Sequence, residues 1–285
     1  MGRETNKSRR AAQAASAREK AAAARVAQAR VEQRRRAVVV LSTVGVLAVV
    51  GAIIAGIAVT SSSKSKAGPA TVAAASVLND VTSVPVATTD AVGKGGSGGL
   101  LKPISDQTTG KPDFFFVGGE FCPYCAGERW AIVQALSRFG TLSGLQQIRS
   151  AEDNFATFDF LHTTYTSKYL TFTPREVSDQ NHQPLQKLST SQQATFSKYS
   201  PGGTFPFLYI GGKYYQVGAG LNVTVLSGLT QAQIASKLKD PTNDVSKAIL
   251  GEANVLTAAI CKATGNKPAS VCTSTITGLQ SQLGT

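Results

Sequence analysis

Two of the four cysteines in this 285-residue sequence lie only three positions apart, and that spacing permits several kinds of chemistry. Cys122 and Cys125, separated by Pro and Tyr, follow an apolar run that ends in two glycines. A C-x-x-C pair can exchange thiols and disulfides, supply half of a zinc site, or close a small structural disulfide. The elements around the pair decide among these possibilities.

The flanking sequence predicts a strand before the pair and a helix after it. Residues 113–119 (DFFFVGG) form a short aromatic run closed by glycines, which is typical of a buried strand. Apolar residues then recur at helical spacing from Trp130 to Phe139, and Gly140 follows as a stop signal. Cys122 therefore lies at the start of the predicted helix, where unpaired N–H groups and the helix dipole both favour a thiolate.

This position makes thiol–disulfide exchange the favoured hypothesis, since the thiolate is the nucleophile in that reaction. Cys122 would attack, and Cys125, one turn further into the helix, would resolve the mixed disulfide. Pro123 suits the first turn because its missing N–H would be unpaired there in any case. A purely structural disulfide across so short a loop would gain little entropy. Tyr124, between the cysteines, is expected to be exposed and to contact substrate.

Zinc is the second interpretation, and it requires four ligands. Cys261 and Cys272 are far away in sequence, their C-x10-C spacing is unlike that of common zinc sites, and His162 and His182 stand in no ligand-like cluster. We therefore expect no metal and no cofactor. Cys261 lies in a predicted helix and Cys272 follows a turn. We predict a structural disulfide between them, with a second redox pair as the alternative.

Two acidic residues, Glu120 and Glu128, flank the cysteine pair. We interpret them as solvated charges at the start of the predicted helix and in its first turns. The alternative is a role in the chemistry, because a carboxylate near a thiolate raises the pKa of the thiol and can carry protons.

The rest of the chain predicts further strands and helices, and a long gap separates the cysteines from the next motif. Strands are predicted within 145–151, 169–177 and 204–218, the last being two strands joined at Gly211-Gly212; helices are predicted at 189–200 and 243–263. Thr230 and Gln233 form a plausible capping box. Between Cys122 and Pro206 lie 83 residues, more than a simple crossover needs, so we expect an insertion at 141–200 that covers the site.

The predicted strand, the C-P-Y-C pair, the helix and a later strand pair entered through Thr204-Phe205-Pro206 resemble the thioredoxin superfamily. The Pro-Tyr dipeptide is similar to that of glutaredoxins, and the whole arrangement looks closest to a prokaryotic membrane-anchored thioredoxin-like family of unknown function. Over residues 77–285 the resemblance implies an α/β, thioredoxin-like fold with an insertion after the C-x-x-C helix and a helical C-terminal extension. It also implies a cis-proline at Pro206 that faces the cysteines.

The resemblance makes Phe205 and Pro206 candidate substrate-binding residues, together with Tyr124. A proline has no N–H and tolerates a cis bond, so the Phe205 backbone would be free to pair with an extended substrate. Phe205 is bulkier than the residues common at that place in the superfamily. Oxidation, reduction and isomerisation are all compatible with the pair, since the direction depends on the relative stability of its two redox forms.

Basic residues concentrate before a long apolar segment. Residues 1–36 carry eleven Lys and Arg and three Glu, a net charge of +8 within the +12 of the chain. Residues 37–60 are 24 uncharged residues, longer than the ~20 needed to cross a bilayer and than the ~7–15 of a secretory signal. We predict one membrane helix there, with a cleaved signal as the alternative.

The basic flank predicts a cytoplasmic tail at 1–36, followed by the membrane helix, a linker at 61–76 and an extracytoplasmic domain at 77–285. That compartment permits disulfides. Residues 37–285 have a net charge of only +4, so no nucleic-acid partner is expected. The expected partners are exported proteins with thiols or disulfides, or a membrane redox partner. A non-catalytic thioredoxin-like binding module with structural cysteines is the competing hypothesis.

Overall fold

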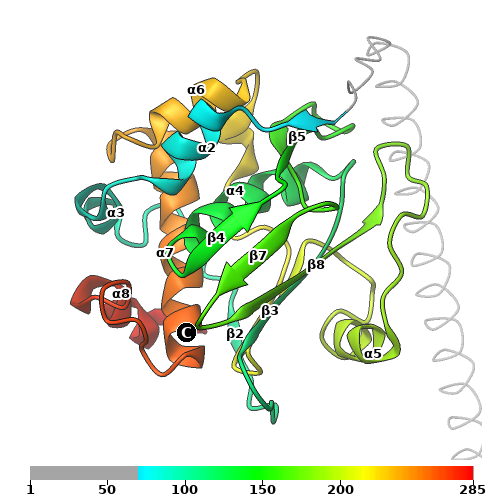
Figure 1. The fold of residues 1–285 in the computed structure, drawn as a ribbon, viewed down its shortest axis with the longest axis vertical. Helices are drawn as coiled ribbons and strands as arrows, with labels where there is room; N and C mark the ends of the chain where they lie inside the picture. Colours follow the sequence, from blue (N-terminus) through cyan, green and yellow to red (C-terminus); the bar gives the residue numbers. More distant parts are fainter. Residues whose placement is uncertain (1–69, 285) are drawn as a thin grey trace, which may run out of the picture. The chain divides into compact units, whose positions relative to one another are not determined.

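The computed structural model describes residues 70–284, which form a mixed α/β domain (Figure 1). The predicted basic tail 1–36 and membrane helix 37–60 lie outside the described residues. Within 70–284, no helix is long and apolar enough to cross a bilayer. The predicted linker 61–76 extends too far: strand β1 (Thr71–Val72) already pairs with strand β5 (Gln146–Arg149), so the folded part begins before residue 77.

A five-stranded mixed sheet has the strand order β2-β10-β9-β3-β8. Its strands are β2 (Lys102–Pro103), β3 (Asp113–Gly119), β8 (Thr171–Ser178), β9 (Phe207–Ile210) and β10 (Tyr214–Val217). The cysteine pair follows strand β3, at the start of the next helix. Strands β3 and β8 run parallel, whereas β9 is antiparallel to both β3 and β10. The predicted hairpin turn at Gly211-Gly212 is confirmed, and both glycines have positive φ.

The described residues form several helices, most of which begin at a residue whose side chain caps the first turn. They are α2 (Ala75–Thr82), α3 (Val86–Val92), α4 (Pro123–Ser137), α5 (Thr190–Tyr199), α6 (Gln231–Lys237), α7 (Asp244–Ala263) and α8 (Ser274–Gly278), with short 3-10 helices η1 (Val223–Leu226) and η2 (Leu279–Gln282). The predicted capping box of Thr230 and Gln233 starts α6. Helix α4 begins at Pro123 with Cys122 as its N-cap, which confirms the predicted helix start.

Strand β3 contributes aromatic side chains to the hydrophobic clusters on both faces of the sheet. Phe114 and Phe116 belong to the main core, whereas Phe115 and Val117 belong to a smaller cluster that includes Phe196 of α5. Successive side chains of a strand point to opposite faces, so this run buries both faces at once. Figure 1 shows α4 and α7 on one side of the sheet and α5 on the other.

The segment between α4 and β8 contains four short strands. They are β4 (Gly140–Ser143), β5, β6 (Ala156–Asp159) and β7 (Thr164–Ser167); β4 pairs with β7, and β5 pairs with β6. Trp130 of α4 packs on Phe158 of β6 with ring centroids 4.5 Å apart, and its Nε1–H donates to the carbonyl of Ala156 at 2.9 Å. Part of the predicted insertion is therefore core that supports α4.

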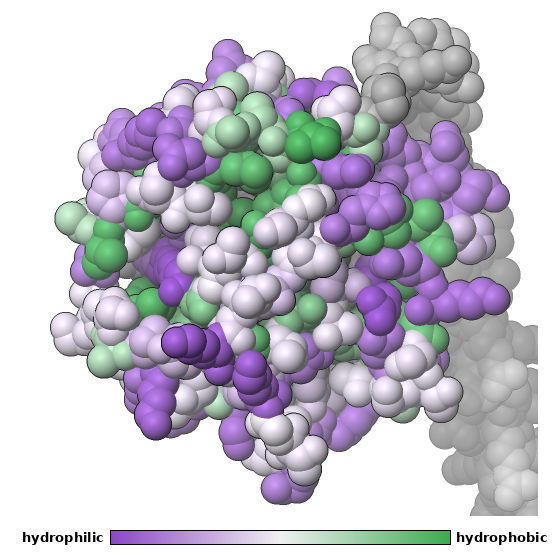
Figure 2. Space-filling view, viewed as in Figure 1, coloured by the Kyte–Doolittle hydropathy of each residue, from purple (hydrophilic) through white to green (hydrophobic). Residues whose placement is uncertain are grey.

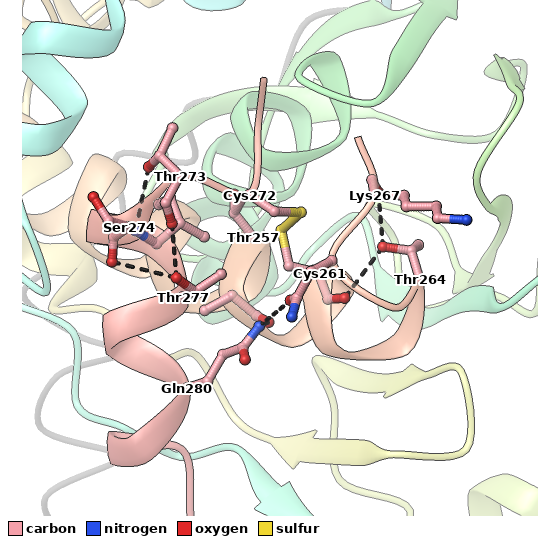
Figure 3. The surroundings of a disulfide bond; sticks show 12 residues. Thr257, Cys261, Thr264, Lys267, Cys272, Thr273, Ser274, Thr277 and Gln280 are labelled. Atoms are coloured by element: carbon pink, nitrogen blue, oxygen red, sulfur yellow. Dashed lines mark hydrogen bonds between the residues drawn. A yellow bond between two sulfur atoms is a disulfide. The ribbon is translucent and has the colours of Figure 1, made fainter. Parts of the chain in front are cut away.

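A disulfide joins Cys261 near the end of α7 to Cys272, two residues before α8 (Figure 3). Around it, Thr264 Oγ1 donates to the carbonyl of Lys267 at 2.8 Å, and the Gln280 amide donates to a carbonyl of α7 at 3.3 Å. These bonds fasten the C-terminal helices to α7. The C-terminal extension is thus helical, as the sequence predicts.

Candidate functional site

The two cysteines of the C-x-x-C pair have different environments, and both are free thiols. Cys122 is the N-cap of α4, and its Sγ accepts a hydrogen bond from the backbone N–H of Cys125 at 3.3 Å. Its side chain is 6% exposed, whereas Cys125 is fully buried. A thiol that caps a helix receives N–H groups that stabilise its anion, so Cys122 is the one suited to attack.

The surroundings move the pKa values of the two thiols in opposite directions. The hydrogen bond from the Cys125 thiol, aided by backbone N–H groups and the charge of Arg129, lowers the pKa of Cys122 from 9.0 to about 7, against the effect of burial. Burial, together with its bond to Cys122, raises the pKa of Cys125 well above its ordinary value. Near neutral pH the pair therefore combines a readily ionised thiol at the helix start with a protonated thiol behind it.

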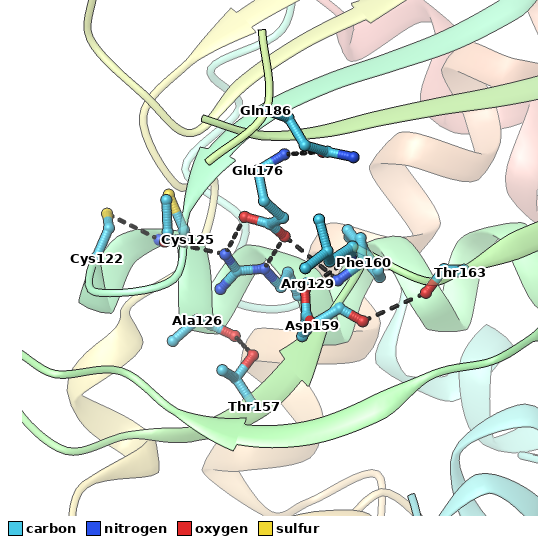
Figure 4. Close-up of polar contacts among 12 residues, drawn as sticks. Cys122, Cys125, Ala126, Arg129, Thr157, Asp159, Phe160, Thr163, Glu176 and Gln186 are labelled. Atoms are coloured by element: carbon cyan, nitrogen blue, oxygen red, sulfur yellow. Dashed lines mark hydrogen bonds and ion pairs between the residues drawn. The ribbon is translucent and has the colours of Figure 1, made fainter. Parts of the chain in front are cut away.

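A fully buried ion pair lies beside the cysteines (Figure 4). Arg129 of α4 donates from Nε and Nη2 to the two carboxylate oxygens of Glu176 on β8, at 2.9 and 2.7 Å. Its Nη2 also donates to the carbonyl of Gly119 at the end of β3, at 2.9 Å. One guanidinium therefore locks the start of the helix to two parallel strands. Its charge also favours the thiolate forms of both cysteines.

Sequence analysis missed Arg129 and Glu176, although part of the signal was present. Helix α4 is buried on nearly every side, so a charged residue in it has to be buried as well and needs a partner. That argument could have singled out Arg129. Its partner is 47 residues away on β8, and only the parallel pairing of β3 and β8 brings the two together.

The expectation that Glu128 is a solvated charge is wrong. Its side chain is fully buried and accepts hydrogen bonds from Gln216 of β10 at 3.1 Å and from the N–H of Gly220 at 2.9 Å. Burial and the adjacent Glu252 carboxyl of α7 raise the pKa of Glu128 well above its ordinary value, and burial also raises that of Glu252. Ionising both carboxyls would place two like charges side by side in the interior, so this arrangement disfavours the doubly charged state.

A Cβ on Gly220 would overlap the Glu252 carboxyl, so a larger residue at this position would displace that carboxyl. The sequence analysis placed Glu128 in the solvated first turns of a helix. Because α4 is covered from all directions, those turns are interior. The carboxyl pair joins α4, α7 and the chain after β10 at one point.

Glu120 is half-buried between β3 and α4, so it too is not simply solvated. Burial and the nearby charges of Asp159 and Glu176 raise its pKa to about 7, which Arg129 opposes. Burial also raises the pKa of Asp159 at the end of β6. A carboxyl with a pKa matching that of the nucleophilic thiol can accept or donate a proton at neutral pH, as the alternative interpretation requires.

Aromatic side chains form the surface around Cys122. Tyr124 is 58% exposed, and Phe205 and Pro206 are joined by a cis peptide bond at the start of β9. Phe121 packs edge-on against Phe205, with ring centroids 5.8 Å apart. The ring of His182 also lies against Phe121, with ring centroids 3.8 Å apart. Phe121 thereby connects the C-x-x-C segment to the segment before β9.

His182 comes from the segment predicted as an insertion, and its sequence neighbours form no ligand-like cluster. It is exposed and lies against Phe121, and its Nε2 is 3.7 Å from the carboxylate of Glu152. No sequence signal links it to the cysteines, because 60 residues separate it from Cys122. In the described residues 70–284, no three His, Cys, Asp or Glu side chains are grouped to hold a metal ion.

A comparison with protein families matches residues 102–202 to a family described as "Domain of unknown function (DUF929)". The matched segment contains both cysteines of the pair, Arg129 and Glu176, and it ends before Phe205. No curated protein and no solved structure matches the chain.

Proposed function

We propose that this protein is a thiol–disulfide oxidoreductase whose active centre is Cys122 and Cys125. The observation that carries the proposal is the position of Cys122 Sγ at the N-cap of α4, bonded to the N–H of Cys125, with the second thiol buried behind it. A structural cysteine has no need of a stabilised thiolate, whereas thiol exchange depends on one.

In the reductive direction, the Cys122 thiolate attacks one sulfur of a substrate disulfide. The substrate S–S bond breaks, one substrate thiolate leaves, and a mixed disulfide forms at Cys122. Cys125 then loses its proton to solvent and attacks Cys122 Sγ, releasing the second substrate thiolate. Two electrons pass from the protein dithiol to the substrate, and the protein is left with a Cys122–Cys125 disulfide. Oxidation of a substrate dithiol follows the same steps in reverse.

The sheet order supports a thioredoxin-like fold for this activity. In the proposed core, β3 and β8 are the parallel strands, β9 and β10 the antiparallel pair, and α4, α5 and α7 the covering helices. The cis bond between Phe205 and Pro206 opens β9, as the resemblance implies. Tyr124 and Phe205, together with the backbone at the buried Pro206, would bind an extended segment of the substrate.

We further propose that the domain acts outside the cytoplasmic membrane, tethered by residues 37–60. The apolar length of that segment and its basic N-terminal flank support this location. The disulfide between Cys261 and Cys272 adds support, because such bonds persist in oxidising compartments. Exported proteins with thiols or disulfides, or a membrane redox partner, would be the substrates.

The proposal is tested by insulin reduction and by trapping. The full chain should reduce insulin disulfides in the presence of dithiothreitol, and Cys122→Ser should abolish the activity. Cys125→Ser should instead accumulate a mixed disulfide at Cys122, because the resolving thiol is missing. Inactivity of the wild-type protein, together with a Cys122 thiol pKa near 9, would reject the enzyme in favour of the binding module.

A further inference from the structure

A cavity of about 230 Å³ lies at the end of α4 opposite to the cysteines. Cys122 caps the N-terminus of this helix, and Arg138 caps its C-terminus and lines the cavity. The other walls are the α2–α3 segment and the segment before α8. Figure 2 shows this face, where hydrophilic atoms lie recessed between α3 and α8 with hydrophobic atoms beside them. The disulfide exchange proposed above makes no use of this site.

In the described part of the chain, the cation of the cavity, Arg138, makes no direct hydrogen bond or ion pair with a carboxylate. Arg138 is half-buried and donates from Nε and Nη2 to the amide oxygen of Gln134, and from Nη1 to that of Asn254 at 2.8 Å. Both acceptors are neutral. A guanidinium has five N–H donors, so two remain for a ligand. Burial lowers the pKa of Arg138 to about 10, against the charge of the nearby Asp90, so the guanidinium stays charged at neutral pH.

The anion of the cavity is Asp90 of α3. Its Oδ1 is buried and accepts no hydrogen bond from residues 70–284, and no ion pair joins Asp90 to Arg138. A buried carboxylate oxygen without a donor is costly, and a bound donor would relieve that cost. The cavity thus presents a cation and an anion, each with unused bonding capacity, that do not satisfy each other.

Apolar side chains complete the walls. Val84 and Val271 are half-buried, Ile276 forms part of the buried base, and Val86 is 57% exposed at the rim. The volume far exceeds the ~10–15 Å³ that one water requires, yet lies below the ~300–1,000 Å³ of sites for drug-sized ligands. A small ligand with both charged and apolar parts fits this combination.

We propose that the cavity binds a small zwitterion with an apolar side chain, of the class of free aliphatic α-amino acids. The ligand carboxylate would pair with Arg138, its ammonium group would donate to Asp90, and its side chain would contact Val86 and Val271. A simple anion suits the site less well, since Asp90 would repel it. A simple cation would be repelled by Arg138.

The disulfide holds one wall of this site in place. Val271 and Thr273 line the cavity on either side of Cys272, whose bond to Cys261 anchors that segment to α7. The other walls come from α3 and α4, which pack with α7. The walls are therefore fixed before a ligand arrives, which lowers the entropy cost of binding.

Isothermal titration of the full chain with L-leucine tests the proposal. We expect binding with a Kd of about 1 mM or tighter. Asp90→Asn keeps the shape but removes the charge, and should weaken binding by about tenfold or more, the effect of one charge-assisted hydrogen bond. Ser270→Tyr, at an exposed rim position, should block the cavity without disturbing the core. N-acetyl-leucine and leucinamide each lack one charge and should bind at least about tenfold more weakly.

The proposal is overturned if wild-type protein binds no leucine at a Kd tighter than about 10 mM. Equal affinity of Asp90→Asn and wild type would also overturn it, as would N-acetyl-leucine binding as tightly as leucine, because the site would then be one for anions only. Thermal unfolding of each variant, with a Tm matching that of the wild type, shows that a loss of binding is not a loss of folding.

Discussion

At the scale of single residues, the difference between Cys122 and Cys125 comes from one turn of helix. Cys122 accepts N–H groups at the helix start, while Cys125 faces the interior. We therefore expect iodoacetamide to alkylate the reduced protein with a pH midpoint near 7, the lowered pKa of Cys122, because the thiolate reacts above that pH. Cys125 should stay unmodified in the folded protein. Mass spectrometry after quenching at each pH measures both.

Two variants sharpen this measurement. Cys122→Ser should remove the reactive thiol, since Cys125 is buried and its pKa is raised. The double variant Arg129→Met with Glu176→Met removes both charges of the buried pair, so it should fold, and it should move the midpoint upward. A wild-type midpoint near 9, or one that the double variant leaves unchanged, would contradict the role given to the helix start and Arg129.

Residue roles could be predicted from the sequence only where local position decides them. The cap at Cys122 and the interior placement of Cys125 follow from the strand–helix junction. The burial of Glu128 and the pairing of Arg129 with Glu176 do not, because both depend on what covers α4 from other parts of the chain. The sequence did contain one indication: charged residues in a helix with no solvent-exposed face must be buried and need partners.

At the scale of elements, the site depends on how closely α4 approaches β3. A Cβ on Gly118 would lie 2.4 Å from the ring of Phe116 and 3.3 Å from Cys125 Sγ. Gly118→Ala should therefore push Cys125 away from Cys122, destabilise the fold by about 1–3 kcal/mol and slow resolution of the mixed disulfide. Urea unfolding and the lifetime of a trapped mixed disulfide measure the two effects.

A matched control is Gly278→Ala in α8, where a Cβ would meet no atom within 4 Å and φ is not positive. This variant should leave stability and resolution unchanged or slightly improve stability, because alanine favours helices. If Gly118→Ala behaves like Gly278→Ala, the close packing of Cys125 on β3 is not what positions the resolving thiol.

Elements with strong local signals could be predicted, and those without could not. Strand β3, helix α7 and the hairpin of β9 and β10 were expected from apolar patterns and turn glycines. The two-residue strands β1 and β2 carry no pattern of their own and form only because β5 and β10 offer free edges. The folded domain consequently starts before the predicted boundary at residue 77.

At the scale of the whole molecule, the domain contains several carboxyls with raised pKa values: Glu120, Glu128, Asp159 and Glu252. In the folded state they keep protons that the unfolded chain loses above its ordinary pKa of ~4. Their contribution to stability is full below that pH and is lost as pH rises through the folded values. The lowered pKa of Cys122 acts in the opposite direction, but only between about pH 7 and 9. Stability should therefore fall from about pH 5 to 8.

The buried pair of Glu128 and Glu252 should dominate this fall, because both carboxyls are fully buried and the charge of Glu252 opposes ionisation of Glu128. Glu128→Gln mimics the protonated carboxyl. The slope of the free energy of unfolding with pH should therefore become smaller, by up to about 1.4 kcal/mol per pH unit, which is the slope that one bound proton produces. Asp244→Asn, at an exposed surface position beside Lys247, is the control and should keep the wild-type slope. Urea unfolding at intervals across pH 5–8 measures all three proteins. Stability that rises over this range, or an unchanged slope in Glu128→Gln, would show that the interior does not hold this proton.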